Sequence, residues 1–170
     1  MELLKAIEKR RSVREFISKN VRWDYVLEAI DAACKAPLAG NQNNLKFILI
    51  QNQEKINKIA EASQQLWINE AKIVVIVCSD EKKLIRLYGE RAKIYSRQQA
   101  GAAIQNFLLT ITSLGMGSCW IGAYADDIVK NIIDIPDNIH IEAILPIGYS
   151  KTKPKPIKKA SIENVIYWDN

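Results

Sequence analysis

Residues 73–78 read Ile-Val-Val-Ile-Val-Cys, and this run decides the kind of fold that the chain can adopt. Apolar, mostly β-branched residues without alternation are typical of a strand that is buried on both faces. Residues 47–50 form a shorter run of the same kind and predict a second strand, while residues 141–147 predict the last core strand. The core is therefore expected to contain a sheet.

Helical patterns separate these strands. Apolar residues recur at spacings of three and four over residues 23–34, and residues 98–114 are apolar and small on nearly every side. The second of these is the expected central helix, buried in the core or at a subunit interface. Alternation of helices and strands alone would favour a parallel α/β sheet. Further helices are expected near residues 3–7, 54–66, 81–95 and 126–133, and a short strand through residues 119–121.

The composition fits one domain whose core needs no cross-link. The chain has 170 residues, of which 48% are hydrophobic. Its cysteines, Cys34, Cys78 and Cys119, are widely spaced in apolar sequence, so we expect reduced packing residues rather than disulfides or a zinc site. The single histidine, His140, has no serine or cysteine motif beside it, which argues against a catalytic triad and against a metal site.

The charge distribution limits the choice of partners. The net charge of +5 is concentrated near residues 10–14 and 151–159, which suits either nucleic acid or a small phosphorylated ligand. No nucleic-acid reading motif is present, so no nucleic-acid partner is expected. The sequence has no apolar run long enough to cross a bilayer and no secretory signal at its start, so we expect a cytoplasmic protein without a membrane partner.

The segment Arg10-Arg11-Ser12-Val13-Arg14 places three guanidinium groups and a hydroxyl within five residues, directly after a short helix. Such a cluster can hold a terminal phosphate without a metal, because guanidinium donors match phosphate oxygens. Cations at a helix end can equally serve the helix dipole or remain solvated. The sequence contains neither a P-loop nor a Rossmann glycine motif, so other phosphate devices are missing.

Two further segments carry polar or unusual chemistry. The loop at residues 39–44 contains Asn41 and Asn43, whose amides could meet the edge of a flat heterocycle or simply form a turn. The C-terminal segment from Ser150 contains Pro154 and Pro156, which favour an extended path, and it ends in an apolar, aromatic run over residues 162–168. That run needs a surface to cover it, on this domain or on a partner subunit.

Five motifs occur in one order along the chain, and together they resemble the nitroreductase family of FMN-dependent oxidoreductases over essentially its whole length. The motifs are Arg10-Arg11-Ser12-Val13-Arg14-Glu15-Phe16, Ala36-Pro37-Leu38-Ala39-Gly40-Asn41, Ala102-Ala103-Ile104-Gln105-Asn106-Phe107-Leu108-Leu109, Leu114-Gly115-Met116-Gly117-Ser118-Cys119-Trp120-Ile121-Gly122 and Leu145-Pro146-Ile147-Gly148-Tyr149.

The resemblance implies an α+β fold, a three-layer sandwich in which a mostly antiparallel sheet is flanked by helices. Residues 1–150 would form the FMN-binding domain, and residues 151–170 an extended C-terminal arm that crosses to the partner subunit of a homodimer. One FMN per subunit would bind at the dimer interface, with NADH or NADPH as co-substrate.

The resemblance also assigns cofactor-binding residues by position. The phosphate and ribityl chain would be held by Arg10, Arg11, Ser12 and Arg14 with Lys159, for which Lys158 is the adjacent alternative. The isoalloxazine ring would meet Pro37, Leu38 and Ala39, with Asn41 and Asn43 at its polar edge or at the ribityl hydroxyls, and the backbone of Ile121, Gly122 and Ala123. No metal site and no catalytic side chain are assigned.

The implied activity is NAD(P)H-dependent reduction of nitroaromatics, quinones or similar electron-poor acceptors by a ping-pong hydride mechanism. The alternatives are a specialised flavoenzyme of the same fold, for dehalogenation, ring oxidation or flavin fragmentation, and an FMN-binding protein without turnover. Tyr88, Arg91, Tyr95 and Trp120 either border the substrate space or pack. The chain departs from the usual family pattern at Asn43-Asn44-Leu45 and at Gln99, and the physiological acceptor and the choice between NADH and NADPH stay open.

Overall fold

The computed structural model describes residues 1–153 and 159–168. The buried run of the sequence forms β2 (Ile73–Ser79), which lies between β1 (Leu45–Ile50) and β4 (His140–Gly148) and pairs antiparallel with both. A short β3 (Gly117–Ser118) pairs antiparallel with β4 and completes the order β1-β2-β4-β3. The parallel sheet that alternation alone favours is therefore wrong, because local periodicity carries no information on strand direction or pairing.

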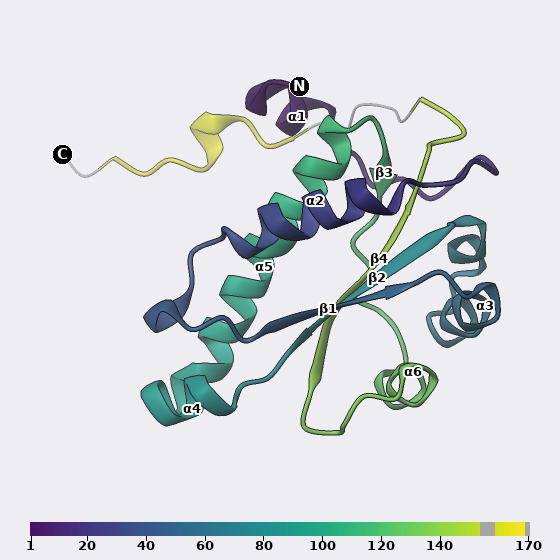
Figure 1. The fold of residues 1–170 in the computed structure, drawn as a ribbon. Helices are drawn as coiled ribbons and strands as arrows, with labels where there is room; N and C mark the ends of the chain where they lie inside the picture. Colours follow the sequence, from purple (N-terminus) through teal and green to yellow (C-terminus); the bar gives the residue numbers. More distant parts are fainter. Residues whose placement is uncertain (154–158, 169–170) are drawn as a thin grey trace.

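Helices cover both faces of this sheet (Figure 1). Alternate residues of β2 point to opposite sides: Val75 and Val77 pack with α2 (Trp23–Cys34) and α5 (Ala92–Ser113). Val74 and Ile76 pack with α3 (Gln53–Ala62) and α6 (Asp126–Ile133). The three-layer α+β sandwich implied by the resemblance is confirmed.

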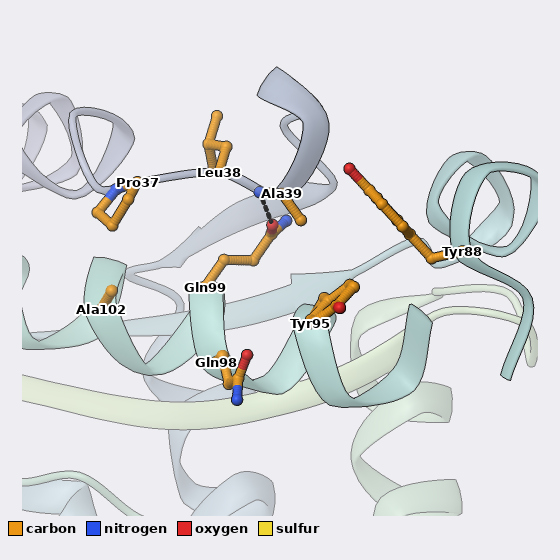
Figure 2. Close-up of a pocket in the computed structure, with 8 residues that line it drawn as sticks. All are labelled: Pro37, Leu38, Ala39, Tyr88, Tyr95, Gln98, Gln99 and Ala102. Atoms are coloured by element: carbon orange, nitrogen blue, oxygen red, sulfur yellow. Dashed lines mark hydrogen bonds between the residues drawn. The ribbon is translucent and has the colours of Figure 1, made fainter. Parts of the chain in front are cut away.

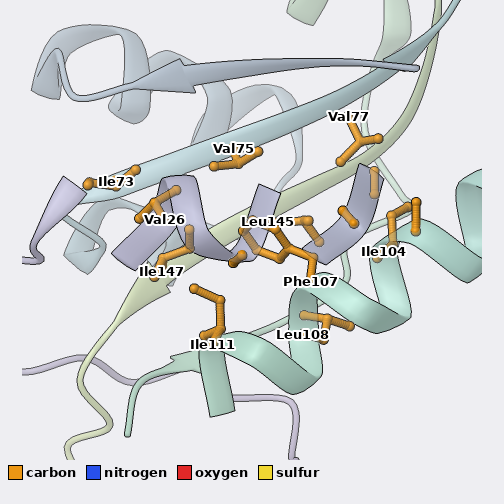
Figure 3. Packing of buried hydrophobic residues seen from close by; sticks show 14 of the residues in the cluster. Val26, Ile73, Val75, Val77, Ile104, Phe107, Leu108, Ile111, Leu145 and Ile147 are labelled. Atoms are coloured by element: carbon orange, nitrogen blue, oxygen red, sulfur yellow. The ribbon is translucent and has the colours of Figure 1, made fainter. Parts of the chain in front are cut away.

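The larger core cluster lies between the sheet and the helix pair α2 and α5 (Figure 3). Phe107 and Ile104 of α5 are fully buried there against Leu145 of β4. Burial of side chains of this size contributes roughly 1.5–3 kcal/mol each. The core thus fixes α5 against the sheet, and α5 in turn carries residues of the cavity described below.

Helix boundaries differ from the sequence prediction around residue 89. The predicted helix 81–95 is instead α4 (Lys82–Tyr88), followed by a 3₁₀ turn η3 (Gly89–Arg91) and then α5. Gly89 has a φ of 52°, a left-handed conformation that ends α4. The sequence also predicted a break between the helices at residues 81–95 and 98–114. That break is absent, because Ser96 lies within α5 and is buried.

Smaller differences affect three other elements. The predicted helix 54–66 ends at Ala62, since Gln64 takes a positive φ of 52°, and a 3₁₀ segment η2 (Leu66–Glu70) follows. The strand predicted over residues 119–121 is shifted to β3 (Gly117–Ser118). Ile121 makes only an isolated bridge with Ile144. The N-terminal helix is α1 (Leu3–Lys9).

Cys78 and Cys119 are buried, but Cys34 is exposed, so its predicted packing role is wrong. Cys34 lies two helical turns after Leu27, which is 44% exposed, and therefore shares the solvent-facing side of α2.

Residues 159–168 of the C-terminal segment run past α1 and away from the sheet (Figure 1). Residues 159–168 contain a single 3₁₀ turn, η4 (Ile162–Asn164), and their large apolar side chains are open to solvent in the single chain: Ile162 is 69%, Tyr167 96% and Trp168 81% exposed. Pro154 and Pro156 lie outside the described residues, as do residues 169–170. Within the described ranges no helix is long and apolar enough to pass through a membrane.

Candidate functional site

The arginine segment is anchored to β3. The backbone N–H of Val13 donates to the Ser118 carbonyl at 3.0 Å, and Ser12 bridges Ser118 in parallel. Val13 is buried so tightly that a Cβ built on Gly117 would lie 2.5 Å from its side chain. Val13 and Phe16 are both buried, whereas Ser12 is partly exposed and Arg14 exposed. The sequence therefore uses apolar anchors to present the polar residues between them.

Arg10, Ser12 and Arg14 all lie near enough to Cys119 to act on its thiol. Burial raises the pKa of this thiol, while the charges of Arg14 and Arg10 and a hydrogen bond with Ser12 act in the opposite direction. Neither Arg10 nor Arg14 forms an ion pair with any acidic group that the structure describes. The three predicted residues therefore lie near one buried thiol, and the two guanidinium groups have no carboxylate partner in the described part of the chain.

Arg11 is directed elsewhere. Its Nη1 donates to the carbonyls of Glu8 at 2.5 Å and Arg10 at 2.8 Å, so it caps the C-terminal end of α1. It also lines a separate cavity of about 220 Å³ with Lys9 and Met116. The Nε of Arg11 is buried and has no hydrogen-bond partner in the described part of the chain.

The segment after β3 leaves backbone open. Ile121 and Ile144 exchange two backbone hydrogen bonds, at 3.0 and 3.1 Å. Gly122 and Ala123 follow and are exposed, and a Cβ added to Gly122 would meet no atom within 4 Å. No backbone carbonyl among residues 1–153 and 159–168 accepts from the Gly122 N–H. A flat ligand can therefore approach this backbone.

Pro37, Leu38 and Ala39 form one wall of a cavity of about 430 Å³ (Figure 2). The opposite wall comes from the end of α4 and from one face of α5, namely Tyr88, Tyr95, Gln98, Gln99 and Ala102. The rings of Tyr88 and Tyr95 meet edge to face with centroids 5.0 Å apart. The spacing 95, 98, 99, 102 on one helix is the signal that could have identified this wall.

Asn41 and Asn43 do not line this cavity. Asn41 is exposed and has a left-handed φ of 55°, within the 3₁₀ turn η1 (Ala39–Asn41). The Asn43 side chain accepts from the Leu45 N–H at 2.9 Å, a local bond that starts β1. The structure of the single chain thus favours the turn interpretation of these two amides.

The predicted site residues form separate surfaces in one chain. The cavity beside Pro37 shares no lining residue with the cavity beside Arg11, and Arg10, Ser12, Arg14 and Gly122 line neither. Lys159 is exposed in the C-terminal segment, and Lys158 lies outside the described residues.

Arg97, Glu81, Glu142 and His140 form a separate cluster of ionisable groups. Arg97 contacts the carboxylates of Glu142 and Glu81, and Glu81 also lies 3.6 Å from His140. In the described ranges, no group of three or more His, Cys, Asp or Glu side chains could hold a metal ion.

Comparison with known proteins gives consistent matches. A family model described as "Nitroreductase family" matches residues 7–149. A "Putative NADH dehydrogenase/NAD(P)H nitroreductase" of Methanothermobacter thermautotrophicus is 31% identical, over 91% of this chain and 80% of the relative. "FMN reductase [NAD(P)H]" of Bacillus subtilis is 25% identical, over 91% and 70%. The crystal structure of a nitroreductase family protein from Clostridium novyi NT superposes with a TM-score of 0.83 at 25% identity, over 91% and 89%.

Proposed function

The chain belongs to the nitroreductase family, and from this premise we propose that it is an FMN-dependent oxidoreductase. It takes electrons from NADH or NADPH and reduces nitroaromatics, quinones or similar electron-poor acceptors in a ping-pong cycle. The observation that carries the proposal is that Arg10, Ser12 and Arg14, presented by the segment bound to β3, lie near Cys119, with neither guanidinium paired to a carboxylate in the described chain. A relative that is 31% identical carries NAD(P)H nitroreductase in its name, which supports the choice of electron donor.

The residues present fit FMN. Arg10, Ser12 and Arg14 supply charge-assisted donors for a phosphate, and Lys159 of the C-terminal segment adds a cation. The Ser118 hydroxyl, next to the backbone of Ser12 and Val13, is buried and has no hydrogen-bond partner among the described residues. This polar atom is therefore free to bind a ligand. Bound FMN supplies the hydride chemistry, accepting electrons from a nicotinamide and delivering them to an acceptor.

The rest of the site is built from backbone and apolar surface. Gly122 and Ala123 leave room and free N–H groups for one face and edge of a flat ring. Pro37, Leu38 and Ala39 offer an apolar wall that excludes water. We assign no side chain as acid or base, and His140 is paired with Glu81.

Because these two surfaces are separate in a single chain, we propose that a homodimer completes each site. Residues 1–150 form the cofactor-binding domain, and residues 151–170 act as an arm that packs on the partner subunit. The exposure of Ile162, Tyr167 and Trp168 supports this, since large apolar side chains at the end of a chain need a covering surface.

The test is an absorbance spectrum of the purified protein after loading with excess FMN and removing the unbound fraction, followed by anaerobic NADH or NADPH. The expected result is one FMN per chain, bleached by at least one nucleotide and recoloured by 4-nitrobenzoate or 1,4-benzoquinone. A protein that takes up no FMN contradicts the proposal. Uptake without bleaching by either nucleotide would instead support a flavin-binding protein without turnover.

A further inference from the structure

A buried chain of polar side chains ties α5 to the loop that walls the 430 Å³ cavity. Ser96 and Gln99 lie on α5 and are 0% and 3% exposed. Asn44 is the residue directly before β1 and is 4% exposed. Gln99 and Asn44 are two of the positions at which the sequence departs from the family pattern. They are close together in the structure, which suggests that the two departures depend on each other.

Each side-chain nitrogen and oxygen of the pair has at least one hydrogen-bond partner. The Gln99 Oε1 accepts from the Ala39 N–H at 3.0 Å (Figure 2), and its Nε2 donates to the Gln42 carbonyl at 3.3 Å and to the Asn44 Oδ1. The Asn44 Nδ2 donates in turn to the Ser96 Oγ at 2.9 Å. A buried network of this kind holds its members in place, and removing one member leaves others unpaired.

The backbone of the loop forms its own hydrogen bonds only in the 3₁₀ turn, where the Asn41 N–H donates to the Leu38 carbonyl at 3.2 Å and the Gln42 N–H to the Ala39 carbonyl at 3.0 Å, so the network adds the link to α5. Gly40 and Asn41 adopt left-handed φ values of 56° and 55°, and the loop has no ladder before β1. The Ala39 N–H donates to no backbone carbonyl in the described part of the chain, so Gln99 is its acceptor. A Cβ on Gly40 would lie 2.6 Å from the Tyr88 hydroxyl, which shows how closely the loop meets the opposite wall.

We propose that Gln99 and Asn44 are positioning residues that set the gap between the Pro37–Ala39 wall and the Tyr88 and Tyr95 wall, and thereby decide which flat acceptors enter. The part that concerns acceptors rests on the proposed function. An amide is needed at position 99 because the same side chain must accept from Ala39 and donate to Gln42 and Asn44. A carboxylate at position 99 could only accept, so the Gln42 carbonyl and the Asn44 Oδ1 would lose the donor that Gln99 provides.

The first experiment does not depend on flavin. Hydrogen exchange of the Ala39 amide is compared in the wild type and in Gln99→Met, which keeps a side chain of similar length without hydrogen bonds. We expect exchange at Ala39 to become at least tenfold faster while that of Ile76 in β2 stays unchanged. Should this variant not fold, Ser96→Ala removes only the far end of the network, and at least threefold faster exchange is expected. Unchanged exchange at Ala39 overturns the inference.

The second experiment uses the FMN-loaded enzyme and the ratio of KM values for menadione and 1,4-benzoquinone, a larger and a smaller flat quinone. Gln99→Met is expected to change this ratio at least fivefold, whereas a general loss of folded enzyme would lower turnover of both and leave the ratio unaltered. An unchanged ratio contradicts the specificity role. If the wild type takes up no FMN, the proposed function fails, and the exchange result alone decides whether Gln99 positions the loop.

A pH profile separates the hydrogen bond from simple packing. In Gln99→Glu, the protonated carboxyl can both accept from Ala39 and donate to Asn44, so the KM ratio should return toward the wild-type value as the pH falls. Gln99→Met should show no such recovery, and the exposed control Gln51→Glu should match the wild type at every pH. The other titratable groups at this cavity are Tyr88 and Tyr95, with Arg91 donating to the Tyr95 hydroxyl at 3.1 Å, and they are common to all variants.

Discussion

At the scale of single residues, the proposed phosphate surface depends on Arg10 and Arg14, neither of which has an acidic partner in the described ranges. Hydrogen bonds between charged groups contribute about 1.5–3 kcal/mol, so Arg10→Gln and Arg14→Gln should each weaken FMN binding by roughly 10- to 100-fold. The measurement is titration of apoprotein with FMN, followed by flavin fluorescence. Arg86→Gln, an exposed change on α4, is the matched control and should bind like the wild type. Equal affinity in all four proteins would remove the arginines from the site.

The cysteines give a prediction about alkaline stability. Burial raises the pKa of the Cys78 thiol from 9.0 to about 12, with the Glu142 carboxylate adding to the effect. The unfolded chain therefore loses this proton at lower pH than the folded chain does. The contribution is complete below pH 9 and is lost as the pH rises toward 12, so the free energy of unfolding should fall over this range.

Urea denaturation at several pH values tests this. Cys78→Ala will be less stable at every pH because it leaves a small cavity, but its free energy of unfolding should fall less steeply above pH 9. Cys34→Ala, at an exposed thiol, should keep the wild-type slope. A Cys78 variant with an unaltered slope would show that this thiol is not the group responsible.

At the scale of elements, two glycines separate fold stability from ligand access. Gly117 of β3 has no room for a Cβ, which would lie 2.5 Å from Val13, whereas a Cβ at Gly122 would meet nothing within 4 Å. Overpacking costs about 1–3 kcal/mol, so Gly117→Ala should lower the free energy of unfolding by that amount and displace the arginine segment. Gly122→Ala should leave stability unchanged and weaken FMN binding, since the methyl group occupies the open backbone face.

Thermal unfolding of the apoproteins and FMN titration measure the two effects independently. A Gly122→Ala protein that binds FMN as tightly as the wild type would exclude this backbone from the ring site. A Gly117→Ala protein of wild-type stability would mean that β3 can shift away from Val13 at little cost.

The elements also show what the sequence could predict. The buried run of β2 and the periodic helices α2 and α6 follow from local pattern, and their bounds lie close to the prediction. The boundary between α4 and α5 does not, because a left-handed Gly89 breaks a pattern that looks continuous. The order β1-β2-β4-β3 is a property of residues far apart in sequence and was not predicted, and only the family resemblance indicated that the sheet is mostly antiparallel.

The candidate site was predictable to a similar extent. Arg10, Ser12 and Arg14 could be proposed as phosphate ligands from the sequence alone, because guanidinium groups and a hydroxyl are clustered within five residues. The capping role of Arg11 and the link between Gln99 and Asn44 were not, since each depends on a contact whose partner the sequence does not specify. A cluster of charged and polar residues can be recognised in the sequence, whereas the direction in which each side chain points depends on tertiary packing.

At the scale of the whole molecule, the C-terminal segment is the part that we propose completes the site in a dimer. Its apolar side chains are exposed in the single chain, and the proposed arm buries them on a partner subunit. A chain that ends after Ala160 retains Lys159 for the phosphate but lacks the aromatic run. We expect it to shift from dimer toward monomer at micromolar concentration and to bind FMN at least tenfold more weakly, because the surfaces around Arg14 and Pro37 then no longer meet. Sedimentation equilibrium with parallel FMN titration is the measurement.

The double change Ile85→Ser and Leu87→Ser, which removes exposed apolar groups from α4 instead, is the control for a general loss of apolar surface. A truncated chain that remains a dimer with wild-type affinity would show that the arm is dispensable and that the subunits associate through the helical layers alone.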